Sequence, residues 1–267
     1  MDAVRPAAVA GLFYPDDPLA LRDEVQRHLR DARPSKGPPP KAIIAPHAGY
    51  AYSGPVAGSA YARLAPLAGV VRRVVLLGPC HRVAVRGLAL PSVTAFETPL
   101  GRVPVDVAAA RRARELPQVS VSDATHRDEH SLEVHLPFLQ IALDDFSVVP
   151  FVVGSASAAE VAQVLDLLWG GPETLIVVSS DLSHYLDYGS AKMVDAETCT
   201  AIEGLAPERL DPEGACGRVP VGGLLVAAMR HGLDVTTVDL RSSGDTAGDR
   251  RRVVGYGAWV FTEGGAA

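Results

Sequence analysis

Six short runs of apolar, often β-branched residues alternate along the chain with longer stretches in which apolar positions recur every three or four residues. The short runs are typical of strands buried on both faces, and the longer stretches are typical of helices with one apolar face. The predicted strands are residues 42–45, 73–78, 148–154, 174–180, 235–240 and 253–261. The predicted helices are residues 18–32, 55–65, 105–115, 157–169, 191–204 and 220–232. This alternation indicates a layered α/β fold with a mainly parallel sheet.

Chain length and linker composition predict the domain organisation. The chain has 267 residues, which suits one large domain with a sizeable core. The Pro-rich segment 32–41 is expected to connect a helix to a strand, because it lies too near the start of the chain to close off a domain. The sequence has no internal repeat, and we predict a single domain over residues 1–267.

Composition and charge argue against several classes of function. Apolar residues make up 48% of the chain, charged residues make up 21%, and the formal net charge is −6, as in an ordinary globular protein. Arg250–Arg252 is a short basic run, and neither a nucleic acid nor an anionic membrane is an expected partner. The first residues do not resemble a signal peptide, and no apolar run approaches the ~20 residues of a membrane span. The three cysteines, Cys80, Cys199 and Cys216, suggest no disulfide framework, which favours a reducing, cytoplasmic location.

Three predicted strands end directly before titratable side chains, which are His47, His81 and the pair Asp181 and His184. In parallel α/β sheets, ligands bind beyond the carboxyl ends of the strands. We therefore expect these side chains to meet at one edge of the sheet and to form a functional site. The alternative for His47, which follows Pro46, is a turn that merely ends the strand.

Two features near this edge have both functional and structural explanations. Asp181 and His184 would lie side by side if a helical turn began there, as a pair for proton transfer, although Asp181 could equally cap that turn. Cys216 precedes a helix that Pro220 can begin, and the helix N-terminus and Arg218 would lower the pKa of its thiol. The alternative for Cys216 is a buried, small hydrophobic residue.

The stretch HRDEH, residues 126–130, matches the H-x-x-E-H pattern of inverted zinc proteases, in which two histidines on one helix face bind zinc. A zinc hydrolase with Glu129 as its base is therefore one hypothesis. Pro137 would interrupt the long helix that this motif requires. We instead expect this segment to form a loop and a helix start facing the same cavity, where His130 and Glu129 or Glu133 contact the substrate or the metal ligands.

Seven segments, in this order, resemble the Memo family and together extend from about Arg5 to Phe261. They are RPAAVAGLFYP (5–15), APHAGYAYSG (45–54), GPCHR (78–82), HRDEHSLEVHLPFLQ (126–140), SSDLSHY (179–185), CGRVPV (216–221) and SSGDTAGDRRRVVGYGAWVF (242–261). The resemblance implies a single-domain, three-layer αβα fold with a mainly parallel mixed sheet, similar to class III extradiol ring-cleavage dioxygenases.

The resemblance also implies the residues of a metal centre. The implied ligands are His47, His81 and Cys216. His184 takes the position of the acid–base histidine of the dioxygenases, with Asp181 beside it. Those dioxygenases bind Fe(II) with two histidines and one carboxylate. A thiolate is a softer third ligand, so iron (Fe2+) is the first expectation and copper(I) or zinc is the alternative.

Cys80, in GPCHR, departs from the small polar residue expected there and adds a second sulfur near the site. Because the side chains of adjacent residues point apart, we assign His81 as the ligand and Cys80 to packing.

Two functions of different classes follow from the resemblance. The first is a cytoplasmic, non-haem, metal-dependent redox enzyme, similar to a dioxygenase, that acts on a small and in particular an aromatic substrate. Asp181 would orient His184 for proton transfer, and His130, Tyr50 and Glu129 would line the pocket. The second is a non-catalytic binding module or adaptor that uses the same pocket for a peptide or small ligand. Bacterial members further imply an association with AMMECR-type and radical SAM proteins.

Overall fold

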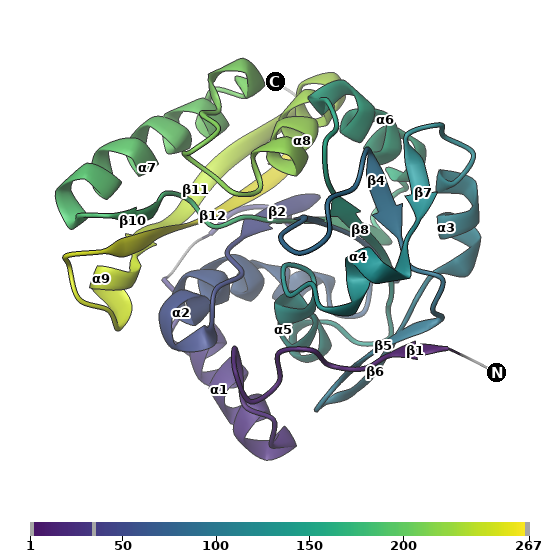
Figure 1. Ribbon diagram of the computed structural model, residues 1–267, viewed down its shortest axis with the longest axis horizontal. Helices are drawn as coiled ribbons and strands as arrows, with labels where there is room; N and C mark the ends of the chain where they lie inside the picture. Colours follow the sequence, from purple (N-terminus) through teal and green to yellow (C-terminus); the bar gives the residue numbers. More distant parts are fainter. Residues whose placement is uncertain (1–2, 34–35, 265–267) are drawn as a thin grey trace.

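Residues 3–33 and 36–264 are described by the computed structural model, in which helices cover both faces of one large mixed sheet (Figure 1). Its strands are β1 (Val4–Arg5), β2 (Ala42–Ala45), β3 (Arg73–Pro79), β4 (Leu88–Leu90), β5 (Ala95–Thr98), β6 (Gly101–Pro104), β7 (Val119–Val121), β8 (Ser147–Val153), β9 (Thr174–Ser179), β10 (His184–Leu186), β11 (Leu233–Ser242) and β12 (Val253–Glu263). Its α-helices are α1 (Pro18–Arg30), α2 (Tyr50–Tyr61), α3 (Val107–Ala113), α4 (Asp123–Arg127), α5 (Leu136–Ala142), α6 (Ala158–Leu168), α7 (Tyr188–Glu203), α8 (Arg218–His231) and α9 (Ser243–Thr246). Short 3-10 helices are η1 (Ala62–Leu67), η2 (Glu133–His135) and η3 (Pro207–Arg209).

The large sheet has the strand order β10-β12-β2-β9-β3-β8-β4-β7, and β11 pairs with β12 outside this path. The central strands β2, β9, β3 and β8 are parallel. On either side of them the pairing becomes antiparallel, between β12 and β2 and between β4 and β8. Because β2, β9 and β3 are parallel neighbours, their carboxyl ends lie side by side at one edge, where the site is built. A small separate sheet has the order β1-β5-β6.

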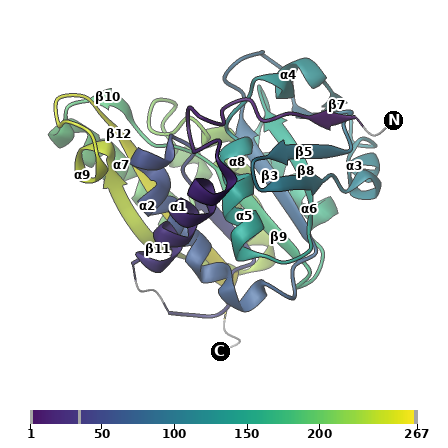
Figure 2. The same ribbon diagram turned by 90° about the horizontal axis from the view of Figure 1, so that it is seen from below.

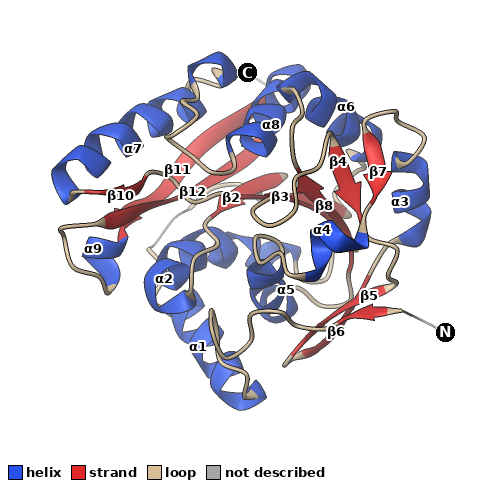
Figure 3. Ribbon diagram, viewed as in Figure 1, coloured by secondary structure: helices blue, strands red, loops and turns tan. Residues whose placement is uncertain are grey.

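Two apolar cores lie on the two faces of the large sheet and make the fold three-layered. One core contains side chains of α3, α6, α7 and α8, and the other contains side chains of α1, α2 and α5. Figure 3 shows the strands as a middle layer between these helices, and Figure 2 shows α1, α2 and α5 in front of the sheet. The central strands are buried along almost their whole length, which explains why they read as continuous apolar runs in the sequence.

All six predicted strands and all six predicted helices are present; β2 has the predicted bounds, and the other elements have shifted ends. The largest shift is in α2, which the sequence places from residue 55 and which begins at Tyr50. A proline is favoured in the first turn of a helix, but Pro55 lies inside α2. The helix extends upstream because Tyr50 is buried against the core, so tertiary packing outweighs the local preference.

The sequence did not predict several short elements. These are the small sheet, the peripheral strands β4, β7 and β10, and the short helices α4 and α9. Strands of two to four residues contain too few positions for a periodic pattern to be distinguished from a loop. None of the helices in the described part of the chain is long and apolar enough to cross a membrane.

Candidate metal centre

Three side chains from distant parts of the chain converge beyond the carboxyl ends of the central strands. His47 follows β2, His81 follows β3 and Cys216 precedes α8. One ligand atom of each residue lies within 4.8 Å of those of the other two. Two imidazole nitrogens and one sulfur are donors that iron, copper and zinc accept. The fold therefore brings together the three residues that were expected as ligands.

The hydrogen bonds around His47 determine which of its ring nitrogens is free. Its Nδ1 lies 2.6 Å from Ser179 Oγ, and that hydroxyl donates to the carbonyl oxygen of Ser131 at 2.6 Å. A hydroxyl has one hydrogen, so Ser179 must accept a hydrogen bond from Nδ1–H of His47. Nε2 of His47 keeps its lone pair and lies 3.4 Å from Cys216 Sγ. Burial lowers the pKa of His47 well below its usual value, which keeps the ring neutral and able to bind a metal.

A buried carboxylate orients His81 in the same way. Nδ1 of His81 lies 2.9 Å from Glu129 Oε1, and the main-chain N–H of His81 donates to Glu129 Oε2 at 2.6 Å. Burial alone would raise the pKa of Glu129, but the hydrogen bond and charge of His81, with main-chain donors, lower it to about 2. The ionised carboxylate accepts Nδ1–H and leaves Nε2 of His81 for a metal. Carboxylates commonly hold metal-binding histidines in this manner.

A second group of potential ligands shares His81. Ligand atoms of His81, Glu129 and His130 also lie within 4.8 Å of one another. The two oxygens of Glu129 already accept hydrogen bonds from the main-chain N–H groups of His81, His130 and Ser131 and from the His81 ring. A metal bound there would have to displace several of these bonds. The group of His47, His81 and Cys216 therefore fits a metal ion better.

Cys216 is held against the loop that follows β9. Its main-chain N–H donates to the carbonyl oxygen of Asp181 at 3.2 Å. The next residue must be small, because a Cβ at Gly217 would collide with the carbonyl oxygen of Ser179. The expectation that Arg218 and the start of α8 lower the thiol pKa is wrong: burial, together with the Asp181 carboxylate, raises the pKa of Cys216. A metal cation would supply the positive charge that stabilises the thiolate.

Asp181 and His184 do not form the expected pair. Residues 180–183 contain no helical turn, and His184 begins β10 with an exposed side chain. Asp181 is buried, and its Oδ1 accepts a hydrogen bond from the main-chain N–H of His47 at 2.7 Å. Burial raises the pKa of Asp181, and the charge of His184 is one of the influences that oppose this rise. The hydrogen bonds of the described residues therefore make Asp181 a positioning group for His47, and none joins it to His184.

His130 packs against both candidate histidine ligands, but neither it nor Glu129 is among the residues that line the cavity beside them, so their proposed contact with a substrate stays a prediction. The ring of His130 stacks on that of His81 with 4.7 Å between the ring centroids, and it meets the His47 ring edge-on at 5.4 Å. Phe13 contacts the His130 ring at 4.8 Å. His130 therefore packs against both candidate histidine ligands and restricts the movement of their rings.

Tyr50 lies in the core. It is 2% exposed, its hydroxyl donates to the carbonyl oxygen of Val134 at 2.6 Å, and its ring packs against Phe138 at 5.0 Å. These contacts join α2 to α5 and leave the hydroxyl occupied. The structure does not bring Tyr50 together with the three candidate ligands.

The HRDEH stretch does not form a zinc-protease helix. Helix α4 ends at Arg127, so His126 and His130 do not share one helix face. His126 is buried, and its Nε2 hydrogen-bonds the carbonyl oxygen of Ala89 at 2.8 Å. Pro137 lies in the first turn of α5, in agreement with its predicted role as an interruption. The zinc-hydrolase hypothesis built on this motif is therefore wrong.

Sequence reasoning missed Ser179 and Ser131, which orient His47. The available signal was the hydroxyl of Ser179 at the end of an otherwise apolar strand, directly before the site. Cys80 behaves as assigned: its side chain packs against the core, and Sγ donates to the carbonyl oxygen of Val83 at 2.6 Å.

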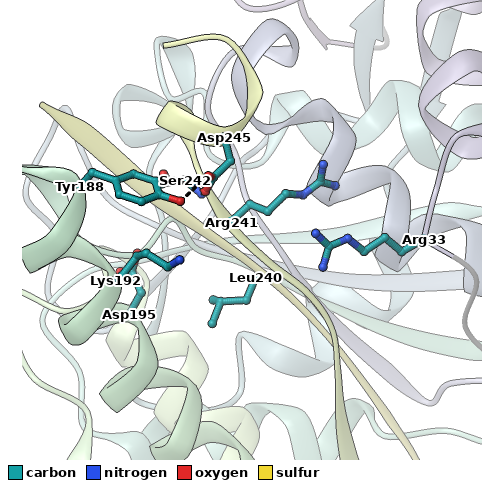
Figure 4. Close-up of a pocket in the computed structure, with 8 residues that line it drawn as sticks. All are labelled: Arg33, Tyr188, Lys192, Asp195, Leu240, Arg241, Ser242 and Asp245. Carbon is teal, nitrogen blue, oxygen red and sulfur yellow. Dashed lines mark hydrogen bonds between the residues drawn. The ribbon is translucent and has the colours of Figure 1, made fainter. Parts of the chain in front are cut away.

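Two cavities differ in how they relate to this site. One, of about 470 Å³, is lined by His81 and Cys216 and so opens beside the candidate ligands. The other, of about 410 Å³, lies between α7 and β11 (Figure 4). In the second cavity Arg241 and Arg33 both pair with Asp239, so most of its charge is neutralised internally.

The fold and the site together define a class, a three-layer α/β protein with a two-histidine, one-cysteine candidate metal centre at the carboxyl edge of its parallel strands. The chain belongs to the Memo-like protein family, whose model matches residues 5–260. It is 36% identical to a MEMO1 family protein of Aquifex aeolicus, over 97% of this chain and 99% of that protein. It is 34% identical to a MEMO1 family protein of Methanothermobacter thermautotrophicus, over 95% of this chain and 98% of that protein.

A solved structure supports the fold alone. It is the crystal structure of an uncharacterized protein from Escherichia coli K12, which aligns with a TM-score of 0.56 over 82% of this chain and 98% of that chain. The sequence identity is 16%, so this likeness concerns the arrangement of the elements.

Proposed function

We propose that this chain is a non-haem, metal-dependent redox enzyme of the cytoplasm, whose His47, His81 and Cys216 hold one iron(II) ion, with copper(I) or zinc as the alternatives. The observation that carries the proposal is the arrangement of the donors. Hydrogen bonds to Ser179 and Glu129 engage the Nδ1 atoms of both histidines and leave their Nε2 atoms available to a metal, and Cys216 Sγ lies 3.4 Å from Nε2 of His47. When bound, the ion would supply Lewis acidity and an accessible redox couple to a small, dioxygenase-type substrate.

The protein's own residues would bind and orient the reactants. Glu129 and Ser179 fix the tautomers of the two histidines, and the carboxylate of Asp181 holds the main chain of His47. His130 stacks on one face of the His81 ring and would help to hold that ring in place. His184, exposed at the edge of the sheet, is the group proposed to take up or release a proton from the substrate.

Metal analysis of protein purified without oxygen tests the proposal. We expect stoichiometric iron in the parent protein and its loss in both Cys216→Ser and His81→Ala. Cys80→Ser is a matched control, because Cys80 is adjacent to His81 but lies outside both groups of potential ligands. Stoichiometric zinc in place of iron would leave the three-ligand site standing and would overturn the redox assignment, because zinc has no redox chemistry. A parent protein that binds none of the three metals would overturn the metal site and favour the binding module for a peptide or small ligand. The association with AMMECR-type and radical SAM proteins stays a prediction.

A further inference from the structure

The cavity beside the candidate ligands has two chemically distinct walls. Its volume of about 470 Å³ lies in the range of small-molecule sites. His81 and Cys216 line it at the candidate metal centre. Apolar side chains form much of its remaining surface, and they are Pro79, Ala84, Val85, Val153, Pro212, Ala215, Val219 and Pro220.

Cys80, Gly154 and Ser155 also line the cavity, together with two arginines that come from separate parts of the chain. Arg82 lies in the loop after β3, and Arg218 is the first residue of α8. Among the described residues neither guanidinium makes an ion pair or a side-chain hydrogen bond, and no acidic residue lines this cavity. α8 also begins at this wall, and the N-terminus of its dipole adds positive potential.

The two cavities differ in whether acidic residues accompany their arginines, as a comparison with the cavity in Figure 4 shows. There, Asp195, Asp245 and the Asp239 that pairs with both arginines balance the basic groups. The cavity beside the candidate metal centre has no acidic residue in its lining, although the whole chain has a net charge of −6. The carboxylates of the site, Glu129 and Asp181, are buried and accept hydrogen bonds from His81 and His47. Unpaired guanidinium groups at the wall of a cleft attract anions and bind carboxylates or phosphates through paired N–H donors.

We propose that this cavity binds a small organic acid, whose carboxylate or phosphate is held by Arg82 and Arg218 and whose apolar body faces the valine-lined wall. This inference rests on the proposed function for the role of His81 and Cys216, and it adds the substrate class. The anionic group anchors one end of the molecule, so the other end is directed toward the candidate metal centre. Two arginines from different elements can hold one carboxylate or phosphate from two sides, which would fix the orientation of the bound acid in an otherwise apolar cavity.

Binding to metal-free protein tests the inference independently of the metal. The probes are benzoate and phenyl phosphate, with benzamide as the neutral analogue of benzoate, and calorimetric titration measures their affinities. We expect both anions to bind the parent protein at least about tenfold more tightly than benzamide does. Arg82→Met and Arg218→Met should each weaken both anions by about tenfold or more, and the loss should shrink as salt is added.

Arg86→Met is the matched control, since Arg86 is an exposed arginine of the same loop that does not line the cavity. Its affinities should equal those of the parent protein. Equal binding of benzamide and benzoate, or no loss in Arg82→Met and Arg218→Met, would overturn the inference. Binding of a phosphotyrosine peptide without binding of either small acid would also overturn it, in favour of a protein partner.

The two proposals fail separately. Metal content is measured in the same variants, and Arg82→Met and Arg218→Met should retain the parent's content because neither residue belongs to a group of potential ligands. A parent protein that takes up none of the three metals but still binds benzoate through both arginines would refute the proposed function and leave the organic-acid site standing.

Discussion

Glu129 and Glu133 are buried carboxylates four residues apart in one segment, and they serve different parts of the molecule. Glu133 accepts hydrogen bonds from Arg5 Nη1 and from the Tyr14 hydroxyl, each at 2.6 Å, and from two main-chain N–H groups of the N-terminal segment. Glu129 accepts hydrogen bonds from the ring and from the main-chain N–H of His81. One carboxylate attaches the start of the chain to the domain, and the other orients a candidate metal ligand.

This difference teaches that burial of a charge does not by itself reveal its role. Both side chains are at most 2% exposed, and both have their oxygens hydrogen-bonded. The two carboxylates differ in whether the groups that donate to them are themselves candidate metal ligands. Arg5, which donates to Glu133, also donates to the main-chain carbonyl oxygen of Glu129 at 2.7 Å, but it belongs to neither group of potential ligands. The donor to Glu129 is the ring of His81, which is itself a candidate ligand.

Glu133→Gln should cost the most stability. It leaves Arg5, 4% exposed, as a buried cation without its carboxylate, and breaking such a pair costs about 3–5 kcal/mol. Urea unfolding measures the change. The control is Asp128→Asn, which removes an exposed carboxylate of the same segment and should cost less than about 1 kcal/mol. The assignment of a structural role to Glu133 and a site role to Glu129 is contradicted if Glu133→Gln has the same free energy of unfolding as the control. It is also contradicted if folded Glu133→Gln protein binds less metal than the parent protein.

Asp195 sharpens the comparison, because it is a buried carboxylate with few partners. It is 4% exposed, it accepts one hydrogen bond from the main-chain N–H of Ser183, and no ion pair joins it to another described residue. Burial raises its pKa from 3.8 to about 6. The folded state therefore binds more protons than the unfolded state between these values, so the free energy of unfolding should fall as pH rises from about 4 to 6.

That fall amounts to roughly 3 kcal/mol at most and persists above pH 6. Asp195→Asn cannot titrate, so it should remove this slope, match the parent protein near pH 4 and exceed its stability above pH 6. Urea unfolding at a series of pH values measures both. A variant that retains the parent's slope would show that Asp195 is not the titrating group.

Glu129→Gln should mainly affect metal binding. The amide cannot accept all four donors that now surround the carboxylate, so the His81 ring loses its fixed tautomer. Replacing a group that holds a metal-binding histidine typically weakens metal affinity about 10- to 100-fold. Competition with a coloured chelator measures the affinity, and Asp128→Asn again serves as the control. An unchanged affinity would mean that Glu129, like Glu133, has a purely structural role.

Ser179→Ala should produce the smallest effect. It removes the acceptor of His47 Nδ1–H, and metal affinity should fall by about tenfold, the lower end of the range for such groups. Ser53→Ala is a suitable control, since this buried serine donates to the carbonyl oxygen of Ala48 and makes no contact with a ligand ring. Equal affinities for the two variants would remove Ser179 from the account of the site.

The sequence predicted the central strands, the covering helices and the approach of His47 and His81 to each other, with Asp181 beside His47. It did not predict that His184 would be exposed and separate from Asp181. The predicted features are readable because buried parallel strands are continuous apolar runs and because their carboxyl ends share one edge. Cys216 was less certain from the sequence alone, since a loop cysteine can equally be core. Its position depends on the tight approach of Gly217 to the β9 loop, which is a property of the folded chain.

Other features could not be predicted because they depend on contacts across the chain. The roles of Glu129 and Glu133 are set by partners 48 and 128 positions away in the sequence, respectively. The thiol pKa of Cys216 is set by burial, which outweighs the helix N-terminus and Arg218. The proposed turn at Asp181 is absent because that carboxylate is occupied by the main chain of His47.

X-ray absorption spectroscopy of the iron-loaded protein tests the central claim most directly, since it counts the sulfur and nitrogen neighbours of the ion. The parent protein and Cys80→Ser should both show one sulfur and histidine nitrogens around iron. Cys216→Ser should lose the sulfur and retain the nitrogens if any iron remains. An iron centre without sulfur in the parent protein, or one whose sulfur survives in Cys216→Ser, would contradict the account.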